Sequence, residues 1–289
     1  MIKGILKSLR VKQWLKNIFL FAALVFDRQL TNTSALVRTI TGFVVFSLIS
    51  SSVYYFNDIF DIDADRNHPK KKNRPIAAGT IPIWLAIVIG VLLGSISLLW
   101  AHILSRSFFF ICLFYLILNL FYSKWIKHLP LLDVMVVASG FVLRVAAGVM
   151  LIEVERFSPW MYVVTTLLAL FIGFGKRRAE LVLLAQEANQ HRKVFDGYTI
   201  DFLDQLITIV SGTTIVAYSL YTFSAPNLPD NNMMMLTIPF VLYGIFRYLY
   251  LIRVKESGGA PEEIVLRDIP LQISILLWGA TVILIFYFS

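Results

Sequence analysis

The chain reads FVVFSLISSSVYYFNDIFDIDAD from Phe43 to Asp65, an apolar run that ends in a cluster of acidic residues. Asp58, Asp61 and Asp65 are spaced i, i+3 and i+7, so on a helix they share one face. Neighbouring carboxylates repel one another unless a cation lies among them. Hard oxygen ligands suit Mg²⁺, which proteins usually hold with one or two carboxylates and the phosphates of a substrate. The sequence therefore predicts a metal site at the end of an apolar helix, with Asn57 assisting the carboxylates.

A strongly basic loop follows this acidic cluster. It reads HPKKKNRP from His68 to Pro75 and includes Arg74. Such cations can hold the phosphate groups of a ligand. The alternative is a solvated helix end with ordinary basic flanks, which explains the lysines but not four aspartates in eight positions. The junction therefore favours chemistry on a Mg²⁺-bound diphosphate.

The composition is that of a membrane protein. The 289 residues are 58% hydrophobic and 15% charged, with a mean hydropathy of +0.74. A soluble domain would carry about 25% charged residues. Apolar runs of about 20 residues recur along the whole length, which predicts an all-α integral membrane protein. The net charge of +8 reflects membrane topology and anionic headgroups, and it does not imply nucleic acid.

We expect nine transmembrane helices around a cytoplasm-facing polar cavity, in a single domain over residues 1–289. The predicted helices cover residues 15–33, 38–60, 81–103, 107–123, 130–152, 158–177, 202–224, 233–253 and 270–288. The first is the weakest, because only Ile18–Phe26 is uninterrupted.

The distribution of basic residues predicts the topology. With nine spans and a cytoplasmic N-terminus, most of the 26 lysines and arginines face the cytoplasm. The opposite side holds Arg28, Arg38, Arg106 and Arg156. The positive-inside rule thus predicts a multi-pass protein of the inner (plasma) membrane, with a cytoplasmic active site and the C-terminus outside.

A second polar cluster ends the sixth predicted helix. Its members are Lys176, Arg177, Arg178 and Glu180. Three consecutive cations suit an anionic substrate, while snorkelling lipid anchors are the alternative. Downstream, Tyr198 precedes Asp201 and Asp204, which either form a second metal site or stabilise a helix N-terminus.

Arg144 lies in the middle of a predicted span. A charge at that depth normally faces the bundle interior and binds a partner or a ligand, and both readings stay open. Lys16, Tyr122 and Lys124 lie near predicted helix ends, where they could reach the cavity. Other chemistries lack support, because the histidines show no metal-ligand spacing and the single cysteine, Cys112, lies in an apolar run.

The pattern N-D-x-x-D-x-x-x-D at Asn57–Asp65, followed by R-P-I-x-x-G at Arg74–Gly79, resembles the UbiA-type intramembrane prenyltransferase superfamily. The resemblance implies nine helices, a cytoplasmic polar cavity and a diphosphate bridged by Mg²⁺. Members normally carry a second D-x-x-x-D motif after the sixth helix. This chain has Lys176–Glu180 there instead.

That departure points to one branch. The Lys-Arg-Arg run, Lys12–Asn17, Tyr122-Ser123 with Leu132-Asp133, and Arg267–Leu271 are similar to the decaprenyl-phosphate phosphoribosyltransferases. The resemblance implies transfer of 5-phosphoribose from 5-phosphoribosyl 1-diphosphate to a polyprenyl (decaprenyl-like) phosphate, for cell-envelope pentose donors.

The expected site follows from the residue pattern together with the family resemblance. Asp58 and Asp61 would be catalytic and would hold Mg²⁺ with Asn57 and Asp65. The expected substrate-binding residues are Lys16, Arg74, Tyr122, Lys124, Arg144, Lys176, Arg177, Arg178, Glu180 and Tyr198. An aromatic polyprenyltransferase of the same superfamily and a transporter of anionic lipids are the alternatives, and the oligomeric state, a homo-oligomer included, stays open.

Overall fold

The computed structural model describes residues 1–68, 71–152, 154, 158–186, 197–226, 228–255 and 261–288, without the side chains of 183–186 and 261–263. Within those ranges every regular element is a helix, which confirms the all-α prediction. Lys70 of the basic loop and Arg156 of the opposite side lie outside the described residues.

The chain divides into two compact units. Unit 1 comprises Met1–Val25, Gln29–Lys127 and Leu143–Val154, and unit 2 comprises Phe26–Arg28, His128–Val142 and Glu155–Ser289. The single domain over residues 1–289 stays a prediction.

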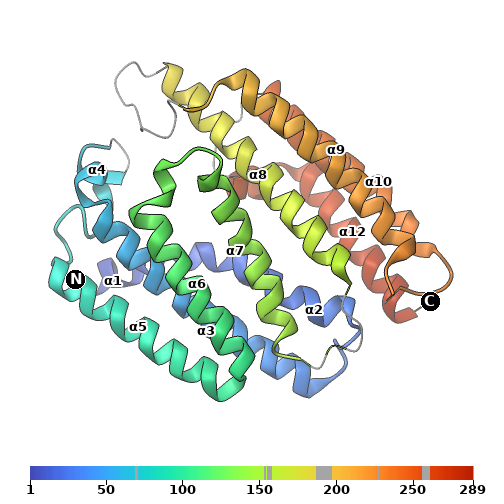
Figure 1. Cartoon of the computed structure of the whole chain (residues 1–289), viewed down its shortest axis with the longest axis horizontal. Helices are drawn as coiled ribbons and strands as arrows, with labels where there is room; N and C mark the ends of the chain where they lie inside the picture. The colour runs from blue at the N-terminus through green and yellow to red at the C-terminus, as the bar shows by residue number, and fades with distance from the viewer. Residues whose placement is uncertain are drawn as a thin grey trace. The chain divides into compact units, whose positions relative to one another are not determined.

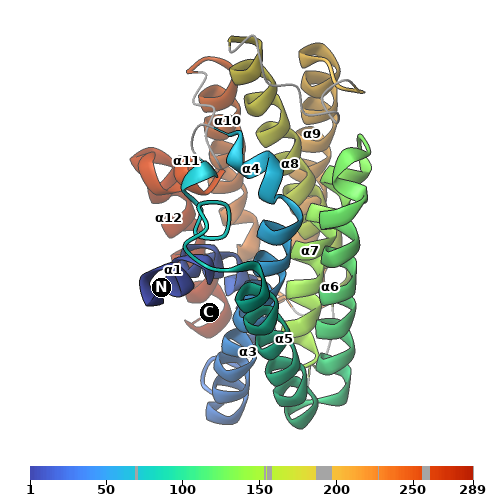
Figure 2. The same ribbon diagram turned by 90° about the vertical axis from the view of Figure 1, so that its left-hand side faces the viewer.

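Unit 1 is built around the long helix α3 (Thr33–Phe60), which packs against α5 (Ile83–Leu104) and α6 (Arg106–Lys124) (Figure 1). Figure 2 shows the same three helices from the side. Its shorter elements are α1 (Ile2–Ser8), η1 (Val11–Leu20), α4 (Ile62–Arg66), η2 (Lys71–Asn73), most of α2 (Phe21–Phe26) and of η3 (Ile126–His128), and the second part of α7 (Leu132–Val149). The core of unit 1 is apolar and includes Phe46 and Phe108.

Unit 2 pairs α8 (Pro159–Gln186) with α9 (Ile200–Ser224), and α10 (Ile238–Arg253) with α12 (Ile269–Phe288) (Figure 1). Its other described elements are η5 (Met233–Thr237), α11 (Pro261–Arg267) and the first part of α7. The side chain of Thr199 caps α9 by accepting a hydrogen bond from the Phe202 N–H at 3.1 Å. This cap fixes where the helix after the second polar cluster begins.

Eight of the nine predicted spans are confirmed as helices long and apolar enough to cross a membrane, counted over the described residues. The first predicted span, 15–33, differs. The chain there forms the 3₁₀ helix η1 and the short helix α2, and α3 begins at Thr33. A 3₁₀ helix of ten residues is long for its kind, so tertiary contacts must hold it.

Those contacts lie along one face of α3. The hydroxyl of Tyr55 donates to the Ile5 carbonyl oxygen at 3.0 Å, and the Ser51 hydroxyl donates to the Leu9 carbonyl oxygen at 2.8 Å. The indole of Trp14 donates to Ser51 Oγ at 3.0 Å. The N-terminal segment (residues 1–20) therefore begins beside the C-terminal end of α3.

The same segment then runs toward the other end of α3. Asn17 Nδ2 donates to Ser47 Oγ at 2.9 Å, three helical turns before Asp58. Gly148 on α7 lets the backbone of η1 approach closely, because a Cβ there would collide with the Leu20 carbonyl oxygen. The N-terminal segment thus runs along α3 without forming one regular helix, and the first predicted span is not confirmed as a membrane-spanning helix within the described residues.

Candidate active site

The acidic motif lies where α3 gives way to α4. Asp58 belongs to the last turn of α3, Asp61 separates the two helices with φ −95° and ψ 6°, and Asp65 lies in α4. Aspartate favours helix ends over helix interiors, because its side chain competes for backbone hydrogen bonds. The three carboxylates therefore do not share one continuous helix face as the spacing predicted.

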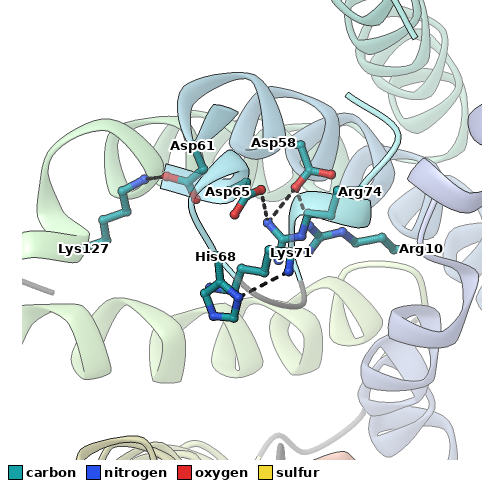
Figure 3. Close-up of polar contacts among 8 residues, drawn as sticks. All are labelled: Arg10, Asp58, Asp61, Asp65, His68, Lys71, Arg74 and Lys127. Carbon is teal, nitrogen blue, oxygen red and sulfur yellow. Dashed lines mark hydrogen bonds and ion pairs between the residues drawn. The ribbon is translucent and has the colours of Figure 1, made fainter. Parts of the chain in front are cut away.

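Asp58 and Asp65 are joined by one arginine. Arg74 Nη1 lies 3.2 Å from Asp58 Oδ1 and 2.6 Å from Asp65 Oδ2. Arg10 also donates to Asp58 Oδ1. Both carboxylates are buried, at 2% exposure each, so their charges depend on these arginines (Figure 3). Arg74 thus lies at the acidic motif, and its phosphate-binding role stays a prediction.

Asp61 has a different partner. Its carboxylate forms an ion pair with the buried Lys127, and Figure 3 shows Lys127 and Arg10 reaching the motif from opposite sides. Lys124, which the sequence suggested instead, is exposed and lies over the Trp125 ring at 4.6 Å. Arg10 and Lys127 are therefore site residues that the sequence analysis missed.

The acidic cluster fits a divalent cation by its donor chemistry. One nitrogen of Arg74 contacts oxygens of both Asp58 and Asp65, so the two carboxylates point toward a common cation position. Two carboxylates completed by phosphate oxygens are a usual Mg²⁺ environment. In the described part of the chain no three His, Cys, Asp or Glu side chains converge on one point. All four expected ligands stay predictions, namely the half-buried Asn57 together with Asp58, Asp61 and Asp65.

The second polar cluster forms a closed network in unit 2. Arg177 Nε donates to Asp133 Oδ2 at 2.6 Å, and its Nη1 donates to Glu180 Oε2 at 2.5 Å. The Tyr198 hydroxyl donates to Asp133 Oδ1 at 2.7 Å and accepts from the Leu131 N–H at 2.6 Å. Burial, and then the hydrogen bond to Asp133, raise the pKa of Tyr198 far above its usual value. Asp133 is fully buried, so this network holds the ends of α7 and α8 together.

The other two cations of the run, Arg178 and Lys176, differ in whether a carboxylate contacts them. Arg178 Nε donates to Asp204 Oδ1 at 2.9 Å, and Arg253 Nε lies 3.1 Å from the same oxygen. Asp204 therefore joins α8, α9 and α10. Lys176 is half-buried and forms no ion pair with any described residue. Of the three consecutive cations, Lys176 is the one whose charge is not matched by a carboxylate of the described chain.

Arg144 faces the interior of unit 1, as predicted. It is 5% exposed, and its Nε donates to Asn17 Oδ1 at 2.8 Å while Nη2 donates to the Tyr115 hydroxyl at 3.0 Å. These bonds connect η1, α6 and α7. Lys16 on η1 and Tyr122 on α6 are half-buried, and their substrate roles stay predictions.

Replacing Tyr198 with Phe should lower the free energy of unfolding by about 1–3 kcal/mol. The buried Asp133 and the Leu131 N–H would both lose a partner, and Leu131 already holds a left-handed φ of 67°, which is costly for leucine. Thermal unfolding in detergent measures the effect. Tyr243→Phe is the control, because Tyr243 is exposed. Equal stability of the two variants would show that the Asp133 network contributes little.

Comparison with known proteins shows the family of the chain. Residues 17–262 match the profile of the UbiA prenyltransferase family. The chain belongs to the UbiA prenyltransferase family. It is therefore an enzyme of the transferase class, and the predicted superfamily is confirmed.

Two relatives show which members of the UbiA family the chain is similar to. It is 35% identical to a decaprenyl-phosphate phosphoribosyltransferase of Mycobacterium tuberculosis, over 98% of this chain and 94% of that protein. It is 33% identical to the protein of the same name from Corynebacterium glutamicum, over 98% and 87%. A structure of a UbiA homolog from Archaeoglobus fulgidus bound to GPP and Mg²⁺ shares the fold, with a TM-score of 0.75 and 20% identity over 98% and 99%. The chain is thus similar to the predicted branch, and its fold is that of UbiA proteins.

Proposed function

We propose that the protein transfers 5-phosphoribose from 5-phosphoribosyl 1-diphosphate to a polyprenyl phosphate and releases diphosphate. The observation that carries this proposal is the similarity, at 33–35% identity over nearly the whole chain, to proteins named decaprenyl-phosphate phosphoribosyltransferases. Lys176 supports it, because its charge is matched by no carboxylate of the described chain and can bind a phosphate group of the donor or of the acceptor.

Asp58 and Asp65 would hold Mg²⁺, with Asp61 and Asn57 as further candidate ligands. The ion, when bound, supplies positive charge to the leaving diphosphate. Arg74 and Arg10 already lie at the two carboxylates and would contact the oxygens of the diphosphate. Lys127 holds Asp61 in place at the junction between α3 and α4.

The reaction itself exchanges one C–O bond for another. The bond from anomeric C1 to the diphosphate oxygen breaks, and an oxygen of the lipid phosphate forms the new bond to C1. Because that oxygen is already anionic, no strong general base is required. The contribution of the protein would be orientation and fixed positive charge.

Lys176→Ala should raise the KM for one of the phosphorylated substrates by about ten- to a hundredfold, with a smaller change in kcat. A single charge-assisted contact to phosphate contributes roughly 1.5–3 kcal/mol, and Lys176 is the cation of the run without a described carboxylate partner. Kinetics with each substrate varied in turn measure this. Lys255→Ala is the control, since Lys255 is an exposed lysine of the same unit. Unchanged constants for both substrates would remove Lys176 from the site.

We further propose that the acidic motif faces the cytoplasm of the inner (plasma) membrane. In a Cys112→Ser background, Lys71→Cys and Asn231→Cys should label from opposite sides, because α5, α6, α7, α8 and α9 separate them in the described chain. Lys71 should react only with reagent on the cytoplasmic side. Labelling of both positions from one side would contradict the topology.

Two substrate pairs test the proposed function. Purified protein with Mg²⁺ receives either labelled 5-phosphoribosyl 1-diphosphate with a polyprenyl phosphate, or a prenyl diphosphate with an aromatic acid. We expect a labelled lipid product only with the first pair. Product only with the second pair would make the protein an aromatic prenyltransferase.

A further inference from the structure

The N-terminal segment carries Arg10 to the acidic motif. Residues before and after Arg10 are fixed to α3 through Ile5, Leu9 and Trp14. Arg10 itself has a left-handed backbone, with φ 51° and ψ 49°, at the turn between α1 and η1. Its guanidinium lies 4.8 Å from the centre of the Tyr54 ring and donates to Asp58 Oδ1. This placement depends on a strained turn and on several tertiary bonds, so it is a specific feature of the fold.

The charge on Asp58 needs a counter-ion for two reasons. The residue is buried, and it lies in the last turn of α3, where the helix dipole disfavours negative charge. Arg10 and Arg74 contact the same oxygen, Oδ1. With Asp65, these residues make a cluster of two cations and two carboxylates, which is neutral overall.

The two arginines are not equivalent. Arg74 also contacts Asp65, so it keeps a carboxylate partner if its bond to Asp58 breaks. In the described chain, the carboxylate that Arg10 contacts is Asp58 alone. The side chain of Arg10 is 23% exposed, so an incoming ligand can reach it. A cation that takes over Asp58 therefore displaces Arg10 from its acidic partner.

We propose that Arg10 is an exchangeable counter-ion, which leaves Asp58 for a phosphate oxygen when a metal diphosphate binds. The proposal rests on the proposed function only in assuming that this site receives a metal-bound diphosphate. A metal ion alone must compete with Arg10 and leaves the guanidinium without an anionic partner. A metal ion that arrives with diphosphate supplies that partner. Arg10 thus makes metal binding depend on diphosphate, which is a coupling between two ligands at one site.

Binding measurements on the full chain in detergent test this exchange. Mn²⁺ replaces Mg²⁺, because the two ions suit the same oxygen ligands. The concentration of free Mn²⁺ is measured by electron paramagnetic resonance. Affinity is measured for Mn²⁺ alone and for premixed manganese diphosphate. Wild type is compared with Arg10→Ala and with Lys12→Ala, the matched control. Lys12 lies on the same segment, is exposed and carries the same charge.

The expected signature is two changes of opposite sign. Arg10→Ala should bind Mn²⁺ alone about fivefold more tightly and manganese diphosphate at least about tenfold more weakly, within the usual range of coupling between ligands. Lys12→Ala should change neither affinity by more than about twofold, since exposed charges interact weakly with the site. Should Arg10→Ala not purify as folded protein, Arg10→Gln takes its place with the same expected signs.

Any other pattern overturns the proposal. If Arg10→Ala weakens both affinities, Arg10 stabilises the site without exchanging. If neither changes, Arg10 does not contact the ligand. The probes contain no ribose and no lipid, so the expected signature together with failed phosphoribosyl transfer would reject the proposed function and leave the exchange intact.

Discussion

Asp58→Asn is expected to lower the rate of phosphoribosyl transfer at least about a hundredfold while leaving the protein folded. The substitution removes a carboxylate at which Arg10 and Arg74 converge, and with it the charge that would hold Mg²⁺ near the leaving diphosphate. Several kcal/mol of charge stabilisation correspond to at least this factor in rate. The amide oxygen of Asn can still accept from both arginines, so folding should survive. Initial rates at saturating substrates, with thermal unfolding in parallel, measure the effect.

The matched control is Asp63→Asn. Asp63 lies on α4 between Asp61 and Asp65, but its side chain is 92% exposed. We expect the Asp63 variant to keep its rate within about twofold. Asp61→Ala should lose activity as strongly as Asp58→Asn if Asp61 is also a ligand. Near-normal Mg²⁺-dependent activity of Asp58→Asn would reject the metal assignment.

Arg177→Ala is expected to destabilise the protein by roughly 3–5 kcal/mol, because it leaves the fully buried Asp133 without its cation. Arg178→Ala is the comparison. Its partner Asp204 is partly exposed and keeps Arg253, so Arg178→Ala should lower the free energy of unfolding by only about 1 kcal/mol. Thermal unfolding of both variants in detergent measures the difference.

The kinetics of the same two variants separate structure from binding. A stable Arg177→Ala protein with a raised KM for a phosphorylated substrate would make Arg177 a phosphate-binding residue, as the sequence first suggested. A destabilised protein with normal KM values would assign Arg177 to the Asp133 network alone.

The fold was largely predictable because membrane helices are long apolar runs. The exception is the N-terminal segment. Its apolar run Ile18–Phe26 gives no indication of a 3₁₀ helix, because that geometry depends on bonds from Trp14 and Asn17 to serines of α3. Those serines lie 37 and 30 residues further along the chain, beyond the reach of any local pattern.

The site was predictable where its members are close in sequence. Asp58, Asp65 and Arg74 lie within one short stretch, and their spacing indicated a shared role. Arg10 and Lys127 lie 48 and 66 residues from the carboxylates they contact. A chain with 26 lysines and arginines offers many candidate partners, and only tertiary structure selects among them.

Asp58 and Asp61 differ in when their basic partners are synthesised. When Asp58 enters the membrane at the end of α3, Arg10 has already been made and can neutralise it at once. The partner of Asp61, Lys127, is made 66 residues later, which at about 5–20 residues per second is a delay of roughly 3–13 s. During this interval α5 and α6 are synthesised. Asp61 therefore waits for its counter-ion through the synthesis of two membrane helices, and a nascent chain that stalls before Lys127 holds this acidic residue uncompensated.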